Sequence, residues 1–260
     1  MTPSTITQLN QLNHDFYQKV AHYFDNSRQY YWQGWQQLIP IIKKLITEKP
    51  LRVLDLGSGN GRFLEFLKEK FPNQPIQYLA VDSNEYLLAK EWQKSAQNFE
   101  RSQFKIDITD ALLSKSFTKT IEEHFKGKNI DLIVSFGFLH HIPSLELRQE
   151  YISQLVQLSA KSNFHSVVIL TAWQFADDDQ QQKKIVNPST VKIDSTELEP
   201  NDYILSWNRG VTAYRYCHHV DEEEVNKFQP LNQNLSFSSF YADGKSGQLN
   251  HYLVWQKRQE

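Results

Sequence analysis

The stretch VLDLGSGNGR, residues Val53 to Arg62, decides the fold that we predict for this chain. A short apolar run, Leu51 to Leu56, leads into three glycines at alternate positions, and a helical pattern follows them. Glycines at such a turn let the backbone approach a ligand without an intervening Cβ. The helix beyond offers free N–H groups at its N-terminus. The segment therefore predicts a buried strand, a ligand-binding loop and a helix.

Strand and helix patterns alternate beyond this loop. Strands separated by helices of about ten residues are typical of a parallel, doubly wound α/β sheet. Two final β-like runs predict a terminal antiparallel hairpin. The strands are expected at Ile76 to Val81, Gln103 to Ile106, Ile130 to Phe136, Ser166 to Trp173, Leu235 to Ala242 and His251 to Gln256, and the helices at Arg62 to Phe71, Glu85 to Ala96, Leu145 to Leu158 and Asp221 to Phe228.

Two segments lie outside this alternation. Residues 1–48 carry two helical patterns and are expected to form an N-terminal helical cap on a main domain at 49–260. Residues 176–220 begin with DDDQQQKK and contain Pro188 and Pro200. They are too long for an ordinary connection. We interpret them as an insertion or lid on the substrate side, following the fifth strand.

Composition excludes several classes of protein. With 40% hydrophobic and 13% aromatic residues in 260, the chain can fill a core, which excludes wholesale disorder. The longest apolar stretches run about eight residues, against the ~20 needed to span a bilayer, and the start MTPSTITQLN lacks the features of a signal peptide. The lone Cys217 excludes an internal disulfide and a cysteine-built zinc site. We therefore expect a cytoplasmic protein with no membrane association and no metal.

Three acids mark the ends of three successive predicted strands. Asp55 ends the first, Asp82 the second and Asp107 the third. Open α/β sheets bind ligands in the crevice at these carboxyl ends, where an acid can accept hydrogen bonds from ribose hydroxyls. A dinucleotide fingerprint would need its third glycine at position 62, which is Arg62 here. The pattern indicates a nucleoside ligand bound by a GxGxG loop.

This pattern resembles the class I S-adenosylmethionine-dependent methyltransferases, in the expected order from Leu51 to Trp173. The resemblance implies a seven-stranded Rossmann-like sheet, with S-adenosyl-L-methionine as cofactor and S-adenosyl-L-homocysteine as product. It implies that Asp55 and the glycine loop hold the amino-acid part of the cofactor. Asp82 would then bind its ribose, and Asp107 with Ile108 its adenine. The residues implied to bind the cofactor are Asp55, Gly57, Ser58, Gly59, Asp82, Ser83, Asp107, Ile108 and Ser135.

Segments outside the cofactor motifs narrow the resemblance. Three segments are similar to the eukaryotic tRNA methyltransferases that esterify 5-carboxymethyluridine at the wobble position. They are YQKVAHYFDNSRQYYW (Tyr17 to Trp32), the paired histidines of FLHHIPS, and NDYILSWNRGVTAYRYCHHVDEEEV (Asn201 to Val225). That family implies tRNA as a partner. It also implies a small zinc-ribbon activator subunit.

The chemistry of methyl esterification sets its own demands. A carboxylate is already a nucleophile at pH 7, so it needs placement, partial desolvation and a cation rather than a strong base. We expect Arg28, His140 and Arg215 to do this work, with Arg209 and His218 as further donors. Trp32, Trp173, Trp207, Tyr214 and Tyr216 are candidates to stack on an extruded base.

Two alternatives remain open from the sequence. The net charge of −2, from 28 Lys and Arg against 30 Asp and Glu, does not indicate a nucleic-acid partner. An enzyme acting alone on a small carboxylic acid or a hydroxyl compound has the same cofactor motifs. A catalytically inactive cofactor-binding scaffold is the third reading, and the intact glycine loop and acids argue against it.

Overall fold

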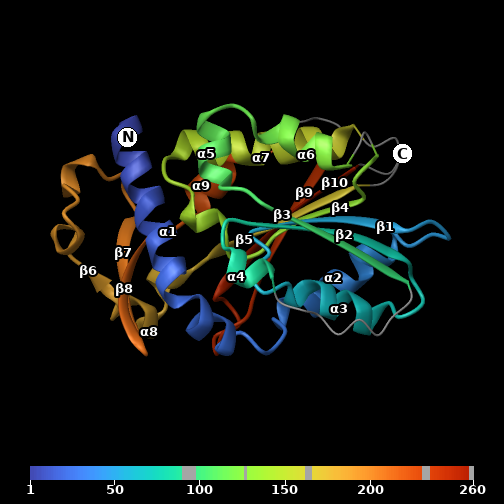
Figure 1. The fold of residues 1–260 in the computed structure, drawn as a ribbon, viewed down its shortest axis with the longest axis horizontal. Coiled ribbons are helices and arrows are strands. Elements are labelled where there is room, and N and C mark those ends of the chain that lie inside the picture. The colour runs from blue at the N-terminus through green and yellow to red at the C-terminus, as the bar shows by residue number, and fades with distance from the viewer. Residues whose placement is uncertain (90–97, 126–127, 162–165, 230–234, 258–260) are drawn as a thin grey trace.

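Seven strands form the central sheet, in the order β3-β2-β1-β4-β5-β10-β9 (Figure 1). The first five are parallel, and β10 runs antiparallel to β5 and β9. This confirms the predicted doubly wound sheet with its terminal hairpin. The strands are β1 (Leu51–Leu56), β2 (Ile76–Asp82), β3 (Phe99–Lys105), β4 (Leu132–Ser135), β5 (Val167–Trp173), β9 (Leu235–Ala242) and β10 (Asn250–Lys257).

The structure, a computed structural model, describes residues 1–89, 98–125, 128–161, 166–229 and 235–257. Its helices are α1 (Pro3–Asn26), α2 (Gly34–Lys43), α3 (Arg62–Lys70), α4 (Glu85–Leu88), α5 (Ile108–Leu113), α6 (Phe117–Phe125), α7 (Leu145–Ala160), α8 (Asp179–Gln182) and α9 (Glu222–Lys227). The helix predicted at Glu85 to Ala96 is short, because α4 ends at Leu88; residues 90–97 lie outside the described residues. No helix in the described part of the chain is both long and apolar enough to cross a membrane.

Helices cover both faces of the sheet. Helices α5, α6 and α7 lie over one face, and α2 and α3 lie over the other (Figure 1). The core divides accordingly into two apolar clusters. One contains Tyr151 and Ile152 of α7, and the other Trp35 of α2 with Phe63 of α3. Covering both faces explains why strands such as β4 are buried at every position rather than at alternate ones.

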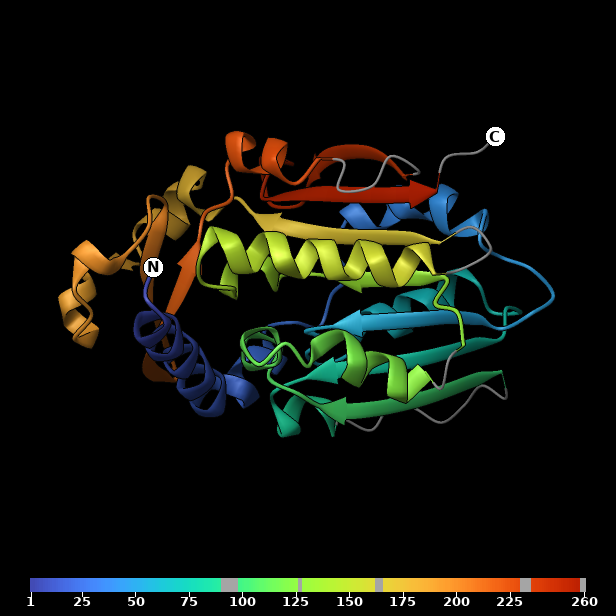
Figure 2. The same ribbon diagram turned by 90° about the horizontal axis from the view of Figure 1, so that it is seen from above.

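The insertion folds into a sheet of its own. Strands β6 (Ile185–Val186), β7 (Asp202–Arg209) and β8 (Val211–His218) form an antiparallel sheet in that order. The sequence pattern does not predict these strands, because the polar start of the insertion and its prolines mask the alternating residues that follow. Helix α1 packs along β8, so the small sheet and α1 stand together beside the carboxyl end of the main sheet (Figures 1 and 2).

A buried polar network ties this small sheet to the main domain. His218 at the end of β8 bonds Asp202 of β7 through Nδ1 (2.7 Å) and Glu224 of α9 through Nε2 (2.6 Å). Arg148 of α7 donates to Glu224 (2.5 Å) and to Glu199 (3.3 Å). Buried charges are tolerated only when they are paired in this way. The network therefore fixes where β8 stands relative to α7.

Candidate active site

The glycine loop turns back over the ends of β1 and β2. Gly57, Gly59 and Gly61 all have positive φ, of +68°, +54° and +69°. A Cβ at position 57 would lie 2.9 Å from the Phe138 side chain, so a larger residue fails there on space as well as on backbone conformation. The loop is held by the Ser58 N–H, which donates to the Val81 carbonyl of β2 (3.0 Å).

The three predicted acids all line one cavity of about 1000 Å³ at this end of the sheet. Asp55 is buried and accepts a hydrogen bond from Tyr78. Asp82 accepts from the backbone N–H groups of Gly59 (2.8 Å) and Asn84 (2.9 Å). Asp107 caps α5 by accepting from the N–H of Asp110 (3.0 Å).

Burial and charge set the ionisation of two of these acids. Burial raises the pKa of Asp55 to about 7, and the nearby Asp82 carboxylate acts in the same direction, against the Tyr78 hydrogen bond. Burial also raises the pKa of Asp82, opposed by its backbone hydrogen bonds. A cationic ligand at this end of the cavity would be stabilised by both carboxylates.

The residues at this end fit the amino-acid and nucleoside parts of S-adenosylmethionine. The Ser58 Oγ is buried and has no hydrogen-bond partner among the described residues, so it is free for a ligand. An ionised carboxylate accepts about four hydrogen bonds, so Asp82 has capacity for two hydroxyls of a ribose. The predicted cofactor residues that line the cavity are Asp55, Gly57, Ser58, Gly59, Asp82, Ser83, Asp107 and Ile108.

Ser135 is the exception, because its side chain does not line the cavity as the prediction requires. Its side chain is fully buried and its Oγ accepts a hydrogen bond from the Tyr151 hydroxyl (2.9 Å). It does not line the cavity, whereas the next residues, Phe136 to Phe138, do. Side chains alternate across a strand, so a shift of one residue reverses the direction in which the side chain points.

The opposite end of the cavity carries cations. Arg28, Lys184, Arg209 and Arg215 line it. The Arg215 guanidinium, in a side chain only 8% exposed, lies 4.9 Å from the ring centre of Trp173 and 5.1 Å from that of Phe16. Within the described residues, no carboxylate pairs with it. A buried cation without an anionic partner is costly unless a ligand supplies the negative charge.

The cations at this end repel one another. Burial, followed by the charge of Arg215, lowers the pKa of Arg28. The same causes lower the pKa of Lys184, to which Arg209 and Arg28 also contribute. An anionic group bound among them would relieve this repulsion. The cavity is therefore polarised: acids gather at the glycine-loop end, with Arg62 beside them, and a cluster of cations surrounds Arg215.

The paired histidines are both buried but differ in their contacts. His140 lines the cavity, its ring centre lies 5.1 Å from that of Trp173, and its Nδ1 has no hydrogen-bond partner among the described residues. His141 has partners at both nitrogens, the Tyr17 hydroxyl at Nε2 (2.8 Å) and the Tyr216 carbonyl at Nδ1 (3.1 Å). Burial lowers the pKa of His140 well below its usual value and that of His141 to about 3. Both rings are neutral at pH 7 and are weak bases.

One group of side chains has the composition of a metal site. The ligand atoms of His140, His141 and Cys217 lie within 4.8 Å of one another. However, both nitrogens of His141 already have hydrogen-bond partners, and burial raises the pKa of the Cys217 thiol to about 12. Metal binding requires a thiolate and a free imidazole nitrogen. The neighbouring Arg215 further disfavours a cation, so the geometry suits packing better than metal binding.

Three candidates from the insertion do not reach the cavity. His218 is held between Asp202 and Glu224, and the buried Tyr216 donates to Asp202 (2.6 Å). Tyr214 packs against the apolar cluster that contains Leu9. The remaining predicted aromatic residues, Trp32, Trp173 and Trp207, do line the cavity.

Sequence reasoning missed other lining residues, among them Asn13, Tyr17, Lys184 and Asp243. Asn13 and Tyr17 fall on the apolar face of α1, where their spacing indicates only core packing. Lys184 belongs to the polar run interpreted as a lid. Asp243 braces the loop between β9 and β10 by accepting from the Gly34 N–H (2.9 Å) and the Tyr252 hydroxyl (2.7 Å). No local pattern marks these positions as part of a site.

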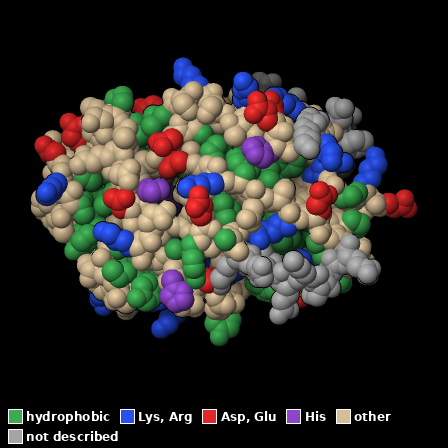
Figure 3. Space-filling model, in the orientation of Figure 1, with side chains coloured by type: hydrophobic (Ala, Val, Ile, Leu, Met, Phe, Trp, Pro, Cys, Tyr) green, Lys and Arg blue, Asp and Glu red, His purple; other side chains and the backbone are tan. Residues whose placement is uncertain are grey.

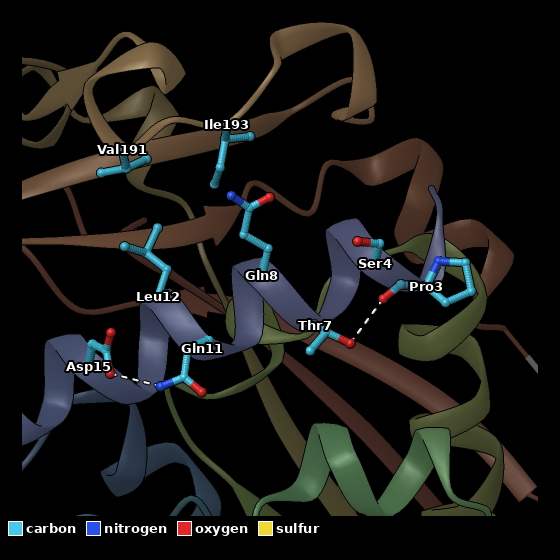
Figure 4. A pocket seen from close by; sticks show the side chains of 9 residues that line it. All are labelled: Pro3, Ser4, Thr7, Gln8, Gln11, Leu12, Asp15, Val191 and Ile193. Atoms are coloured by element: carbon cyan, nitrogen blue, oxygen red, sulfur yellow. Dashed lines mark hydrogen bonds between the residues drawn. The ribbon is translucent and has the colours of Figure 1, made fainter.

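A second hollow has no such chemistry. It is a groove beside the N-terminal half of α1, lined by Gln8, Leu12, Val191 and Ile193 among others (Figure 4). Thr7 and Gln11 use their side chains within the helix, on the Pro3 carbonyl (3.0 Å) and on Asp15 (2.8 Å). The polarised cavity is therefore the candidate active site.

The fold is that of the class I S-adenosylmethionine-dependent methyltransferases, and the residues of this site fit their cofactor. A structure of such an enzyme from Clostridium acetobutylicum is similar, with a TM-score of 0.59 at 14% identity over 94% of this chain and 99% of that one. An amino pentose methyltransferase from Micromonospora echinaspora (TM-score 0.51, 13% identity, 92% and 97% covered) is also similar. Magnesium protoporphyrin IX methyltransferase from Synechocystis is similar too, with a TM-score of 0.51 at 15% identity over 87% of this chain and 82% of that one.

The family model for the methyltransferase domain matches residues 24–224, so the chain belongs to the methyltransferase domain family. The residues of the glycine-loop end fit S-adenosyl-L-methionine as the methyl donor of such a domain, with S-adenosyl-L-homocysteine as the product. No curated protein matches the sequence. The family match assigns no methyl acceptor.

Proposed function

We propose that this enzyme esterifies a carboxylate, and that its acceptor is 5-carboxymethyluridine at the wobble position of tRNA. The observation that carries the proposal is the buried Arg215 guanidinium between Phe16 and Trp173, which has no anionic partner in the described part of the chain. A carboxylate of the acceptor would supply that partner. It would also reduce the repulsion that lowers the pKa values of Arg28 and Lys184.

The scarcity of bases beside Arg215 favours a carboxylate over a hydroxyl acceptor, since Asp55, with a pKa of about 7, lies at the cofactor end of the cavity. Neutral His140 and His141 have lowered pKa values, and burial raises the pKa of Tyr17. A hydroxyl acceptor must lose a proton during methyl transfer, which requires a base with a pKa near the working pH. A carboxylate oxygen attacks the methyl carbon directly, the carbon–sulfur bond breaks toward sulfur, and no proton has to move.

Aromatic side chains support a planar acceptor. Trp32, Trp173 and Trp207 line the cavity, and enzymes that act on loop bases stack the extruded base on such rings. Tyr23, Tyr30 and Tyr86 are among the few large exposed apolar side chains, and each is next in sequence to a residue that lines the cavity. Exposed aromatic rings suit stacking on unpaired bases.

A small carboxylic acid is the second candidate. On the face seen in Figure 3, basic and acidic side chains are interspersed, with no continuous basic surface. One of the similar structures is an amino pentose methyltransferase, and another acts on magnesium protoporphyrin IX. An acceptor of that size would use Arg215 in the same way and would need no extended phosphate contacts.

The test is methyl transfer from S-adenosylmethionine to tRNA bearing 5-carboxymethyluridine, read by nucleoside mass spectrometry. We expect a methyl ester on that nucleoside and rates that fall steeply with salt, because phosphate contacts release counterions. The assay is run with and without a zinc-ribbon activator subunit. Esterification of the free nucleoside at equal efficiency, with little salt dependence, would support the small-acceptor function. Transfer to neither acceptor in either setting would exclude the tRNA proposal.

A further inference from the structure

Three groups form a hydrogen-bonded chain that ends in the cavity. The Tyr17 hydroxyl lies 2.8 Å from His141 Nε2, and His141 Nδ1 lies 3.1 Å from the backbone carbonyl of Tyr216 in β8. Tyr17 lines the active-site cavity, and His141 is only 5% exposed. The chain runs from the edge of the small sheet, through the second histidine of the HH pair, to a phenol that faces the ligand.

The direction of these hydrogen bonds is fixed by the carbonyl. A carbonyl oxygen only accepts, so His141 Nδ1 must carry the proton. The nearby Asn13 amide is already oriented, because its Oδ1 accepts from the Tyr216 N–H (2.8 Å), and its Nδ2 faces the His141 carbonyl (3.3 Å) and also His141 Nδ1 (3.4 Å). The Tyr216 carbonyl is the closer partner of Nδ1 (3.1 Å), so it sets the tautomer. A neutral imidazole with the proton on Nδ1 has a bare Nε2. His141 Nε2 consequently accepts the hydroxyl proton of Tyr17.

This direction leaves Tyr17 with one role toward a ligand. Its only proton is used on His141, so its oxygen can accept from the cavity and cannot donate to it. In the described part of the chain, no other group donates to this oxygen. The Tyr17 carbonyl accepts from Asn84 Nδ2 (3.1 Å), two residues beyond Asp82, and the Tyr17 ring centre lies 5.0 Å from that of Phe16, which Arg215 contacts. Tyr17 therefore lies between Asp82 and Arg215.

An electropositive ligand group is the electrostatic complement of an oxygen that only accepts. The acceptor contributes its anionic end to the cations beyond, and the nucleoside lies with the acids. The sulfonium centre and its methyl group form the junction between cofactor and acceptor, and they carry the positive charge. A carbon–hydrogen group on such a centre makes a weak hydrogen bond to an oxygen.

We propose that the Tyr17 hydroxyl oxygen, restricted to accepting by His141, receives the methylsulfonium of the cofactor and favours S-adenosylmethionine over S-adenosylhomocysteine. Tyr17 is then a specificity residue for the charged cofactor over the neutral product. His141 is a positioning residue that acts through Tyr17. The proposal does not depend on which acceptor is methylated.

The test measures the dissociation constants of both compounds by calorimetry, in the absence of acceptor. In Tyr17→Phe the preference for S-adenosylmethionine, expressed as the ratio of the two constants, should fall about two- to fivefold, the size expected for weak hydrogen bonds. Tyr203→Phe is the matched control, because Tyr203 is half-buried and does not line the cavity. Its ratio should equal that of the wild type.

His141→Asn separates the direction of the hydrogen bond from the presence of the ring. The asparagine Nδ2 can still donate to the Tyr216 carbonyl, but nothing then accepts the Tyr17 proton, and the hydroxyl can turn to donate into the cavity. We expect the ratio to fall as in Tyr17→Phe. An unchanged ratio in Tyr17→Phe, or an equal loss of affinity for both compounds, would overturn the proposal. If thermal unfolding shows that His141→Asn does not fold, the comparison of Tyr17→Phe with Tyr203→Phe decides the test.

Discussion

The carboxylate of Asp82 accepts a hydrogen bond from the backbone N–H of Gly59 at 2.8 Å. This bond joins the end of β2 to the middle of the glycine loop, two segments 23 residues apart. It uses one carboxylate oxygen, while the Asn84 N–H occupies the other. The same residue thus shapes the loop and presents its remaining lone pairs to the cavity.

Replacing Asp82 should abolish most cofactor binding. Asp82→Ala removes two charge-assisted hydrogen bonds to a ribose, each worth about 1.5 kcal/mol, so the dissociation constant of S-adenosylmethionine should rise about 100-fold. Calorimetry measures it, with Asp179→Ala, an exposed acid of α8, as the control. Unchanged affinity in Asp82→Ala would show that the ribose lies elsewhere.

Cofactor affinity should depend on the ionisation of Asp55. Burial raises the pKa of this carboxyl to about 7. Below that pH the group is protonated and neutral, so it no longer attracts the ammonium group of the cofactor. Affinity should therefore rise roughly tenfold from pH 6 to pH 7.5. Calorimetry across this range checks it, and Asp55→Asn should bind with little pH dependence. A wild-type affinity that does not change with pH would contradict the assignment of Asp55 to the ammonium group of the cofactor.

Arg215 should contribute to the use of the acceptor and not to the binding of the cofactor. Because a hydrogen bond to a charged group contributes about 1.5–3 kcal/mol, Arg215→Ala should lower kcat/KM for the acceptor about 10- to 100-fold. The affinity for S-adenosylmethionine should stay within about twofold. Arg215→Lys should recover little, since an ammonium group does not stack between Phe16 and Trp173 as a planar guanidinium does. An equal loss of cofactor affinity would place Arg215 in the cofactor site or the fold.

His218 should stabilise the protein more at low pH than at high pH. Burial alone would lower its pKa, but the hydrogen bonds to Asp202 and Glu224 outweigh burial and raise the pKa. A raised pKa means that the stabilisation is complete below the unfolded value, about 6.5, and is lost as pH rises through the folded value.

Denaturant unfolding of His218→Ala tests this. Removing the histidine that two buried carboxylates share should cost roughly 3–5 kcal/mol at pH 6, although Glu224 keeps Arg148 and Asp202 keeps Tyr216. The difference from the wild type should be smaller at pH 9. His124→Ala, which changes an exposed histidine, should differ little from the wild type. A difference that grows with pH would contradict the assigned charge on His218.

The main sheet and the cofactor end of the site could be predicted from sequence because both depend on local patterns. A strand ending at Asp55, followed by glycines with positive φ, leaves few other conformations for the chain. The strand β1 appears at its predicted bounds, Leu51–Leu56. The three acids converge because parallel strands end at one edge of a sheet. The strands β7 and β8 escaped prediction because the polar start of the insertion and its prolines masked the alternating residues that follow.

The sequence by itself therefore determined the class of fold and the position of the glycine loop with its three acids, since these follow from residues that are neighbours along the chain. Only the tertiary structure decided what each side chain does at the acceptor end. It placed Arg215 between rings from α1 and β5, turned Ser135 into the core, and bound His218 into a buried network. It also set the direction of the Tyr17–His141 hydrogen bond through a carbonyl of β8. The physical reason is that burial and hydrogen-bond partners come from segments distant in sequence, and they decide whether a residue binds a ligand or supports the fold.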